Sequence, residues 1–283
     1  MIVANTIAQA RQQIADVRRH GKTIGLVPTM GALHEGHRAL IRRCRDECDF
    51  VVVSIYVNPA QFGPKEDLAA YPRDFDADCR ACREDQVDLV FAPNDEEMYG
   101  QSHLAWIDVD RLGDHLCGRS RPGFFRGVCT AVAKLFNIIA PDLAYFGEKD
   151  AQQLAIVRRM VHDLNFNLEI RPCPTVRTAE GLALSSRNDY LDDKQRPQAL
   201  CLFEALRHGA AMVSRGVLDA QAIIGEMKAL IDKQPAARID YISIVDEEFL
   251  QPVTQITAPC LIALAVQIGA PRLIDNIRVA PPE

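Results

Sequence analysis

The chain has 283 residues, of which 48% are hydrophobic and 25% are charged, and its formal net charge is −6. This balance is typical of a soluble globular protein with one large or two ordinary domains. The negative charge disfavours a nucleic-acid partner, because such binding depends on clustered Lys and Arg. No apolar run approaches the roughly 20 residues that span a bilayer, and the N-terminus lacks a signal-peptide pattern, so we expect no membrane association and a cytoplasmic location.

Nine cysteines are scattered along the chain. Such an odd, scattered set fits reduced thiols better than a disulfide framework. Cys44 and Cys48, with Cys79 and Cys82, could be imagined as a zinc site. Zinc is disfavoured, because both pairs fall in predicted helices and neither is flanked by the Gly-rich turns of zinc knuckles.

Strand and helix patterns alternate along the first two-thirds of the chain. Apolar runs that end at turn signals predict strands, and apolar residues at helical spacing predict the helices between them. Thr6 with Gln9 resembles a capping box at the first helix. Alternation of this kind implies an α/β fold with a Rossmann-like parallel sheet. We predict strands over 23–27, 50–57, 87–91, 143–146 and 168–171, helices over 7–20, from 37 onward, 75–84, 128–139 and 152–164, and a long loop over 94–124 with one short strand at 106–109.

The pattern changes after about residue 175. We predict two helices, over 194–214 and 219–233, followed by strands over 241–245, 260–267 and 273–279. Only Gly-Ala-Pro separates the last two strands, so we expect them to pair as a hairpin. The sequence therefore predicts a first domain over 1–175 and a smaller C-terminal α+β domain over 176–283.

The stretch 23–41 reads TIGLVPTMGALHEGHRALI. It joins a strand to a helix through a turn that contains Gly31, and such a helix N-terminus favours phosphate through its unpaired N–H groups and its dipole. His34 and His37 are three residues apart, so their rings point the same way on a first helical turn. Ordinary surface histidines are the alternative, and the spacing excludes the HExxH pattern of zinc proteases.

Polar residues follow three further elements. Gln61, in the sequence NPAQF after the second strand, suits a substrate with hydroxyl and carboxylate groups, although Asn-Pro could simply make a turn. In FGEKD after a later strand, Lys149 suits phosphates and Asp150 a ribose hydroxyl or a helix cap, and Gln153 lies one turn on. An ordinary loop would explain the Gly and Asp of this turn, but less readily the Lys. The segment 184–188, LSSRN, is either an exposed linker turn or a loop that closes over phosphates.

Taken together, PTMGALHEGH, VNPAQF, FGEKDAQQ and LSSRN, in this order and spacing, resemble the pantothenate synthetases (pantoate–β-alanine ligases). The similarity runs over nearly the whole chain and is strongest from about 23 to 191. HEGH resembles the HIGH element, and SSR resembles the KMSKS-type loop, that class I aminoacyl-tRNA synthetases share with nucleotidylyltransferases.

The resemblance implies a ligase that works in two steps. Pantoate carboxylate attacks the α-phosphorus of ATP to give pantoyl adenylate and pyrophosphate, and β-alanine then attacks the acyl carbon and releases AMP. It also implies Mg²⁺ on the ATP phosphates, with Asp78 as a further contact, and a homodimer built through the first domain. Gln61 and Gln153 would bind pantoate, and His34, His37, Lys149 and Arg187 would be catalytic. The ATP site would comprise Met30, Gly31, Ala32, Leu33, His34, Glu35, Gly36, His37, Gly147, Glu148, Lys149, Asp150, Val176, Leu184, Ser185, Ser186 and Arg187.

The chain departs from the family pattern at two positions. Where the family tends to read LEG and RPGHF, this chain has Cys117 and Phe124, so the polar role of this pocket-wall loop is open. A nucleotidylyltransferase of the same superfamily is the main alternative, but a phosphate acceptor would call for Arg or Lys in place of Gln61 and Gln153. A nucleotide-binding regulatory module would not need Lys149 together with the SSR loop, and a tRNA ligase is disfavoured by the negative charge and the small second domain.

Overall fold

The computed structural model describes residues 1–64 and 66–282, and the chain divides into two compact units. The first unit contains Met1–Val109, Pro122–Glu148 and Ile156–Pro174. The second contains Asp110–Arg121, Lys149–Ala155 and the chain from Thr175 onward. Two short segments that precede residue 175 in the sequence thus pack with the C-terminal part of the chain.

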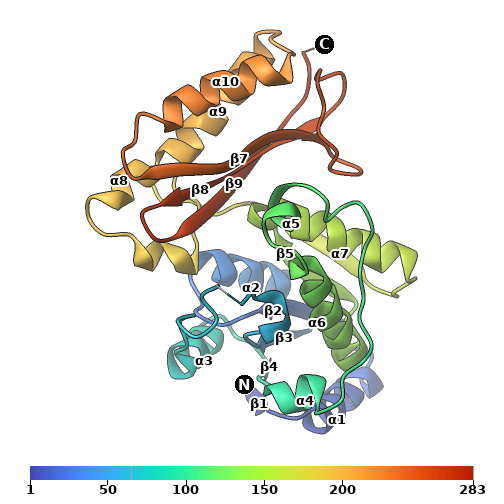
Figure 1. Ribbon diagram of the computed structural model, residues 1–283. Helices are drawn as coiled ribbons and strands as arrows, with labels where there is room; N and C mark the ends of the chain where they lie inside the picture. Colours follow the sequence, from blue (N-terminus) through green and yellow to red (C-terminus); the bar gives the residue numbers. More distant parts are fainter. Residues whose placement is uncertain (65, 283) are drawn as a thin grey trace. The chain divides into compact units, whose positions relative to one another are not determined.

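The first unit is built on a parallel sheet (Figure 1). Within residues 1–64 and 66–282 this sheet has six strands in the order β1-β4-β3-β2-β5-β6, and every neighbouring pair is parallel. The predicted parallel sheet is confirmed. Its strands are β1 (Ile2–Ala4), β2 (Ile24–Thr29), β3 (Phe50–Ile55), β4 (Leu89–Phe91), β5 (Leu143–Gly147) and β6 (Glu169–Cys173).

Apolar faces of helices cover this sheet. Leu40 and Ile41 of α2 (Glu35–Glu47) pack with Val27, Val51 and Val53. These valine side chains alternate along β2 and β3 toward one face of the sheet. The predicted capping box of Thr6 and Gln9 is present at the start of α1. The helices that begin before residue 175 are α1 (Ile7–Arg19), α2 (Glu35–Glu47), α3 (Phe75–Glu84), α4 (Asp95–Tyr99), α5 (Leu116–Ser120), α6 (Phe124–Ile139) and α7 (Ala151–Asp163), with the short 3-10 turns η1 (Pro59–Gln61) and η2 (Glu148–Asp150).

In the second unit, helices pack on a small antiparallel sheet in the order β7-β8-β9, three strands within the described residues. β8 and β9 form the predicted hairpin, with Cys260 opposite Val279 and Gln267 opposite Arg272. Leu206 and Met227, on two helices, share a buried core with Leu264. The elements after residue 175 are η3 (Ser186–Tyr190), α8 (Gln195–Ala199), α9 (Cys201–Ser214), α10 (Ala220–Ile231), β7 (Ala237–Asp246), β8 (Cys260–Ile268) and β9 (Arg272–Val279).

Two predicted elements are wrong. No strand forms over 106–109, because the N–H of Ile107 donates to the Thr130 hydroxyl, 3.0 Å away, rather than to another strand. The Trp106 ring instead stacks beside Tyr99 and under the Arg126 guanidinium. The single helix predicted over 194–214 is divided at Leu200, whose N–H bonds to the carbonyl of Pro197 three residues back instead of continuing the α-helical pattern.

Strand β1 and the short helices α4 and α5 were not predicted, since each is too short to carry a periodic signal. Among the described residues, no helix is long and apolar enough to cross a membrane.

Candidate active site

Two of the predicted site motifs follow neighbouring strands of the parallel sheet. After β2 the chain passes to β3 and β4 on one side, and after β5 it passes to β6 on the other, so β2 and β5 flank the point where the strand order reverses. In open α/β sheets, ligands bind outside the carboxyl ends of the strands at such a switch point. Met30–His37 follows β2, and Gly147 ends β5 with Glu148 directly after it, so this position marks both strand ends of the first unit as a candidate ligand site.

The turn after β2 is held by a buried carboxylate. Asp78, on α3, accepts hydrogen bonds from the N–H groups of Ala32 (3.0 Å) and Leu33 (2.7 Å) through different oxygens. Burial raises the pKa of Asp78, and the two backbone hydrogen bonds oppose that shift. Gly31 has φ +80°, and a Cβ there would lie 2.7 Å from Oδ2 of Asp78. Gly31 is therefore needed for the turn itself and for the approach of Asp78.

Asp78 was predicted to contact Mg²⁺, and the structure gives it a different set of partners. The residue is only 4% exposed, and both of its carboxylate oxygens accept hydrogen bonds from backbone N–H groups. This geometry favours a role in shaping the turn. Among residues 1–64 and 66–282, no group of three or more His, Cys, Asp or Glu side chains is arranged to hold a metal ion.

The two histidines form the cap of α2. Nδ1 of His34 accepts from the N–H of Gly36 at 3.1 Å, and Nδ1 of His37 accepts from the N–H of His34 at 3.4 Å. The ring centroids are 4.0 Å apart, so the rings do lie together, as their spacing predicts. Because Nδ1 is an acceptor in both rings, a neutral ring must carry its proton on Nε2. Each histidine therefore offers an Nε2–H donor at a helix N-terminus, where the dipole also favours an anion.

Asn58 organises the turn that carries Gln61. Its buried side chain accepts from the N–H of Ala60 at 3.2 Å and donates to Oε1 of Gln61 at 3.0 Å and to the carbonyl of Gly127 at 3.1 Å. Nε2 of Gln61 lies 3.1 Å from Sδ of Met30. Asn58 is therefore more than a turn residue, because it fixes the amide plane of Gln61 beside the β2 turn.

Lys149 and Gln153 belong to the second unit. Lys149 lies in η2, is 20% exposed, and its Nζ is 3.8 Å from Oδ1 of Asp150. Gln153, in the first turn of α7, is half-buried. The cation, the carboxylate and the amide are thus concentrated at the N-terminus of one helix, as the FGEKDAQQ motif predicts.

The LSSRN segment forms a short capped turn. Val176 and Leu184 are joined where the N–H of Leu184 donates to the carbonyl of Val176 at 3.0 Å. Ser185 caps η3 by accepting from the N–H of Arg187 at 3.3 Å. Ser185, Ser186 and Arg187 are all half-buried, so the segment is a fixed turn rather than an exposed linker.

Sequence reasoning missed Gln152. This buried residue precedes Gln153, and its Nε2 donates to the carbonyls of Leu112 and His115, both at 2.8 Å, while its Oε1 accepts from the N–H of Cys117 at 2.9 Å. The amide thus fastens the segment 110–121 to the start of α7. A glutamine among other polar residues gives no sequence signal for this role, because its partners lie about 35 to 40 residues away.

The two departures from the family pattern lie in helices rather than in a loop. Cys117, on α5, is buried, with Sγ 3.3 Å from the Tyr241 hydroxyl and 3.6 Å from the nearer nitrogen of Arg272. Phe124 is the first residue of α6, and its ring packs edge-on to Phe125. The pocket-wall loop expected here is therefore wrong as a description of the backbone.

The predicted site residues fall into two sets. The set in the first unit comprises Met30, Gly31, Ala32, Leu33, His34, Glu35, Gly36, His37, Gln61, Asp78, Gly147 and Glu148, and the set in the second unit comprises Lys149, Asp150, Gln153, Val176, Leu184, Ser185, Ser186 and Arg187. Apart from Gly31 and Asp78, these residues are at least partly exposed, as residues that bind a ligand must be. A parallel sheet with an anion-favouring helix cap at its switch point is the design of a nucleotide-using enzyme.

Comparisons with known proteins agree with this class. Residues 2–278 match the family model described as pantoate-beta-alanine ligase. A pantothenate synthetase from Pelotomaculum thermopropionicum is 51% identical over 98% of both chains, and one from Thermotoga petrophila is 50% identical over 98% of this chain and 99% of the relative.

Solved structures are similar over the same length. A crystal structure of pantothenate synthetase from Thermus thermophilus has a TM-score of 0.94 at 43% identity and covers 99% of this chain and 100% of that chain. A pantoate-beta-alanine ligase from Francisella tularensis, complexed with beta-gamma ATP and beta-alanine, has a TM-score of 0.82 at 34% identity and covers 98% of this chain and 97% of that chain. The chain belongs to the pantoate–β-alanine ligase family. It is an enzyme with the ligase activity for which that family is named.

Proposed function

We propose that the enzyme joins pantoate to β-alanine through a pantoyl-adenylate intermediate and releases pyrophosphate and AMP. The placement of Met30–His37 after β2, at the switch point of the sheet, carries this proposal, because it directs an anion-binding helix cap to the edge at which ligands bind. The Francisella tularensis relative complexed with beta-gamma ATP and beta-alanine supports the choice of substrates.

In the first step, a pantoate carboxylate oxygen attacks the α-phosphorus of ATP, and the bond from that phosphorus to the bridging oxygen of pyrophosphate breaks. A carboxylate and a triphosphate repel each other, so the site must supply positive charge and hydrogen-bond donors. We assign the donors to Nε2–H of His34 and His37 and the positive charge to Lys149 and Arg187. The remaining residues of the predicted ATP site would hold the nucleotide.

In the second step, the β-alanine nitrogen attacks the acyl carbon, and the bond from that carbon to the AMP oxygen breaks. The nitrogen must be neutral to attack and loses a proton as the amide forms. Gln61 and Gln153 would hold pantoate, since each amide offers both a donor and an acceptor for hydroxyl and carboxylate groups. No covalent attachment to the protein is required, because positioning and charge stabilisation carry both steps.

Mg²⁺ enters the proposal as part of the co-substrate. Mg²⁺ is commonly bound by substrate phosphates with few protein ligands, and Asp78 uses both its oxygens to hold the β2 turn. We therefore assign Mg²⁺ to the ATP phosphates rather than to a site built by the protein. A first domain over 1–175 that binds ATP and pantoate and a C-terminal lid domain over 176–283 are further proposals, as are a cytoplasmic location and a homodimer, which the family resemblance implies.

The test is an assay of pyrophosphate release with ATP, pantoate and Mg²⁺, with and without β-alanine. We expect about one equivalent of pyrophosphate per active site without β-alanine, and continuous release with it, because the adenylate is retained until an amine consumes it. Release of pyrophosphate or AMP that does not depend on pantoate would contradict the proposal.

A further inference from the structure

Strand β9 contacts the backbone of Lys149 through one side chain. Nδ2 of Asn276 donates to the carbonyl oxygen of Lys149 at 2.9 Å. Lys149 lies in the short turn η2, two residues before the first residue of α7. This hydrogen bond therefore fixes the backbone from which the Lys149 side chain extends.

The preceding residue of β9 holds a second segment. Asp275 is 3% exposed and accepts two hydrogen bonds from the Arg177 guanidinium, at 2.5 and 2.8 Å. Arg177 also donates to the carbonyl of Gly181 at 3.2 Å, and its guanidinium lies 3.9 Å from the ring centroid of Phe203. Three partners thus fix the guanidinium: the Asp275 carboxylate accepts two of its hydrogen bonds, the Gly181 carbonyl accepts a third, and the Phe203 ring packs against its face.

Arg177 begins the segment that leads to Ser185–Arg187, here called the serine turn. Arg177 pairs with Ala183 as an antiparallel bridge, and the next residue, Leu184, donates to the carbonyl of Val176. The chain then enters Ser185, the cap of η3. Fixing Arg177 therefore fixes the two-stranded base from which Ser185–Arg187 projects.

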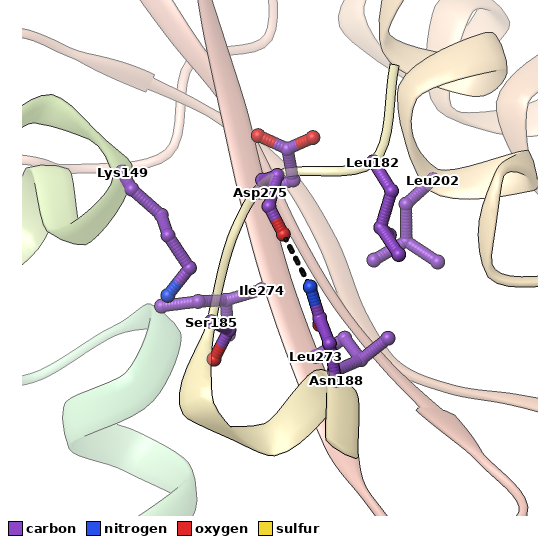
Figure 2. A pocket seen from close by; sticks show the side chains of 9 residues that line it. Lys149, Leu182, Ser185, Asn188, Leu202, Leu273, Ile274 and Asp275 are labelled. Atoms are coloured by element: carbon purple, nitrogen blue, oxygen red, sulfur yellow. Dashed lines mark hydrogen bonds between the residues drawn. The ribbon is translucent and has the colours of Figure 1, made fainter. Parts of the chain in front are cut away.

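Asp275 and Asn276 are consecutive residues of one paired strand. Consecutive side chains of a strand point to opposite faces, so a single strand can serve both segments. Asp275 is opposite Leu264 and Asn276 is opposite Ala263 on β8, which anchors the strand. Figure 2 shows that Lys149 and Ser185 line one small cavity together with Leu273, Ile274 and Asp275 of β9. The two segments thus border the same space, and β9 forms one of its walls.

We propose that Asp275 and Asn276 are positioning residues. Asp275 holds Arg177 and, with it, the serine turn, and Asn276 holds Lys149. Together they keep the two segments at the spacing that ATP requires. This inference rests on the phosphate-binding roles proposed above for Lys149 and Ser185–Arg187. We assign no contact with ATP to either β9 residue. Their effect on catalysis passes through the groups they hold.

The first test is Asn276→Asp, which replaces the amide donor with an oxygen of the same size, so that two acceptors face each other at the Lys149 carbonyl. We expect the KM for ATP to rise about tenfold, the effect of losing one well-placed hydrogen bond, and the KM for pantoate to stay within about twofold. Asn137→Asp makes the same change at an exposed position of α6 and should leave both constants unaltered. An unchanged KM for ATP in Asn276→Asp, or an equal rise in both constants, overturns the proposal.

A double-mutant cycle separates this inference from the function on which it rests. In a Lys149→Ala background, Asn276→Asp should raise the KM for ATP by less than about twofold, because the side chain that Asn276 positions is absent. If the two substitutions raise the KM for ATP by factors that multiply, the positioning role of Asn276 is overturned, while the role of Lys149 is unaffected. Wild-type kinetics in Lys149→Ala alone would instead contradict the proposed function.

The second test uses Arg177→Lys, which keeps the positive charge but loses the two parallel hydrogen bonds that the guanidinium donates to Asp275. It should raise the KM for ATP, and its effect should fall below about twofold in an Arg187→Ala background. Thermal unfolding of each variant reports its stability. A loss of stability without a rise in the KM for ATP would assign Arg177 and Asp275 a role in stability alone.

Discussion

Nδ1 of His37 accepts a hydrogen bond from the backbone N–H of His34 at 3.4 Å, while Nδ1 of His34 accepts from the N–H of Gly36. The pair is therefore a reciprocal helix cap built from two imidazoles, in the place where a Ser or Thr with a Glu or Gln is usual. One structural feature serves two purposes. Capping stabilises α2, and it also keeps the Nε2–H tautomer that can donate to a phosphate.

The two purposes of His37 can be separated by mutation. His37→Ala should lower stability by about 1 kcal/mol through the lost cap and lower the rate of pyrophosphate release roughly 100-fold or more through the lost donor. His37→Glu keeps an acceptor for the N–H of His34, so its stability should be close to that of the wild type, yet its activity should be at least as low because a carboxylate repels the triphosphate. Urea unfolding and the pyrophosphate assay measure the two effects, and an active His37→Glu enzyme would refute the assigned role.

Asp78 should matter to ATP binding through the turn that it holds. In Asp78→Asn one amide oxygen can still accept, but the –NH₂ group faces the N–H of Ala32 or Leu33. We expect a loss of about 1–3 kcal/mol in the free energy of unfolding and a higher KM for ATP. Asp76→Asn changes an exposed carboxylate on the same helix and serves as the control. If the two variants bind ATP equally well, Asp78 does not shape the nucleotide site.

The strand-end motifs were predictable because each is contained within about ten residues. PTMGALHEGH carries its own strand end, turn glycine and helix start, so its local structure follows from the sequence. Asp78 was not predictable as the support of that turn, since its partner Leu33 lies 45 residues earlier. Gln152, Asp275 and Asn276 are similar cases. Their side chains contact distant backbone or side chains, and only the folded chain shows which partners those are.

Errors in the predicted elements have the same origin. The apolar residues near Trp106 resemble a strand by composition, but their burial comes from packing on Tyr99 and Arg126 and from the Thr130 hydroxyl. Strand β1 contains only three residues, two of them exposed, and exists because β4 offers it an edge. Tertiary context, rather than local propensity, therefore decided both cases.

Glu47 should make the stability of the first unit depend on pH. It accepts hydrogen bonds from Nε of Arg43 at 2.8 Å and from the Tyr145 hydroxyl at 3.0 Å. The bond from Arg43 and, to a smaller extent, those from Tyr145 and the charge of Arg171 lower the pKa of Glu47 below its ordinary value, against the opposing effect of burial. A carboxyl whose pKa is lowered by folding contributes stability above its unfolded pKa and loses it as the pH falls through the folded one.

We therefore expect Glu47→Gln to lower the free energy of unfolding by about 1–2 kcal/mol at pH 7, and the gap from the wild type to close as the pH falls below about 4. Urea unfolding of both proteins across this range measures the difference. Glu226→Gln, at an exposed position of α10, should leave the stability nearly unchanged at every pH. A gap that stays constant down to about pH 3, below the ordinary pKa of a glutamate, would show that packing rather than charge is lost.

Gly127 of α6 should control the position of Gln61. An ideal Cβ at Gly127 would lie 2.2 Å from the carbonyl oxygen of Ala60 and 2.7 Å from the backbone nitrogen of Gln61. Backbone atoms cannot turn aside as a side chain can, so in Gly127→Ala either α6 or the turn must move. Asn58 donates both to Gly127 and to Gln61, so the displacement passes to the Gln61 amide.

Gly127→Ala should thus lower stability by about 2 kcal/mol and raise the KM for pantoate about tenfold or more, with the KM for ATP changed little. Gly225→Ala is the matched control, because a Cβ at that position of α10 meets nothing within 4 Å. The control should be neutral or more stable by about 0.5–1 kcal/mol, since alanine favours a helix over glycine. Initial rates measured at varied pantoate and at varied ATP give the two KM values. An unchanged KM for pantoate in a destabilised Gly127→Ala enzyme would remove Gln61 from the pantoate site or show that the turn absorbs the shift without moving it.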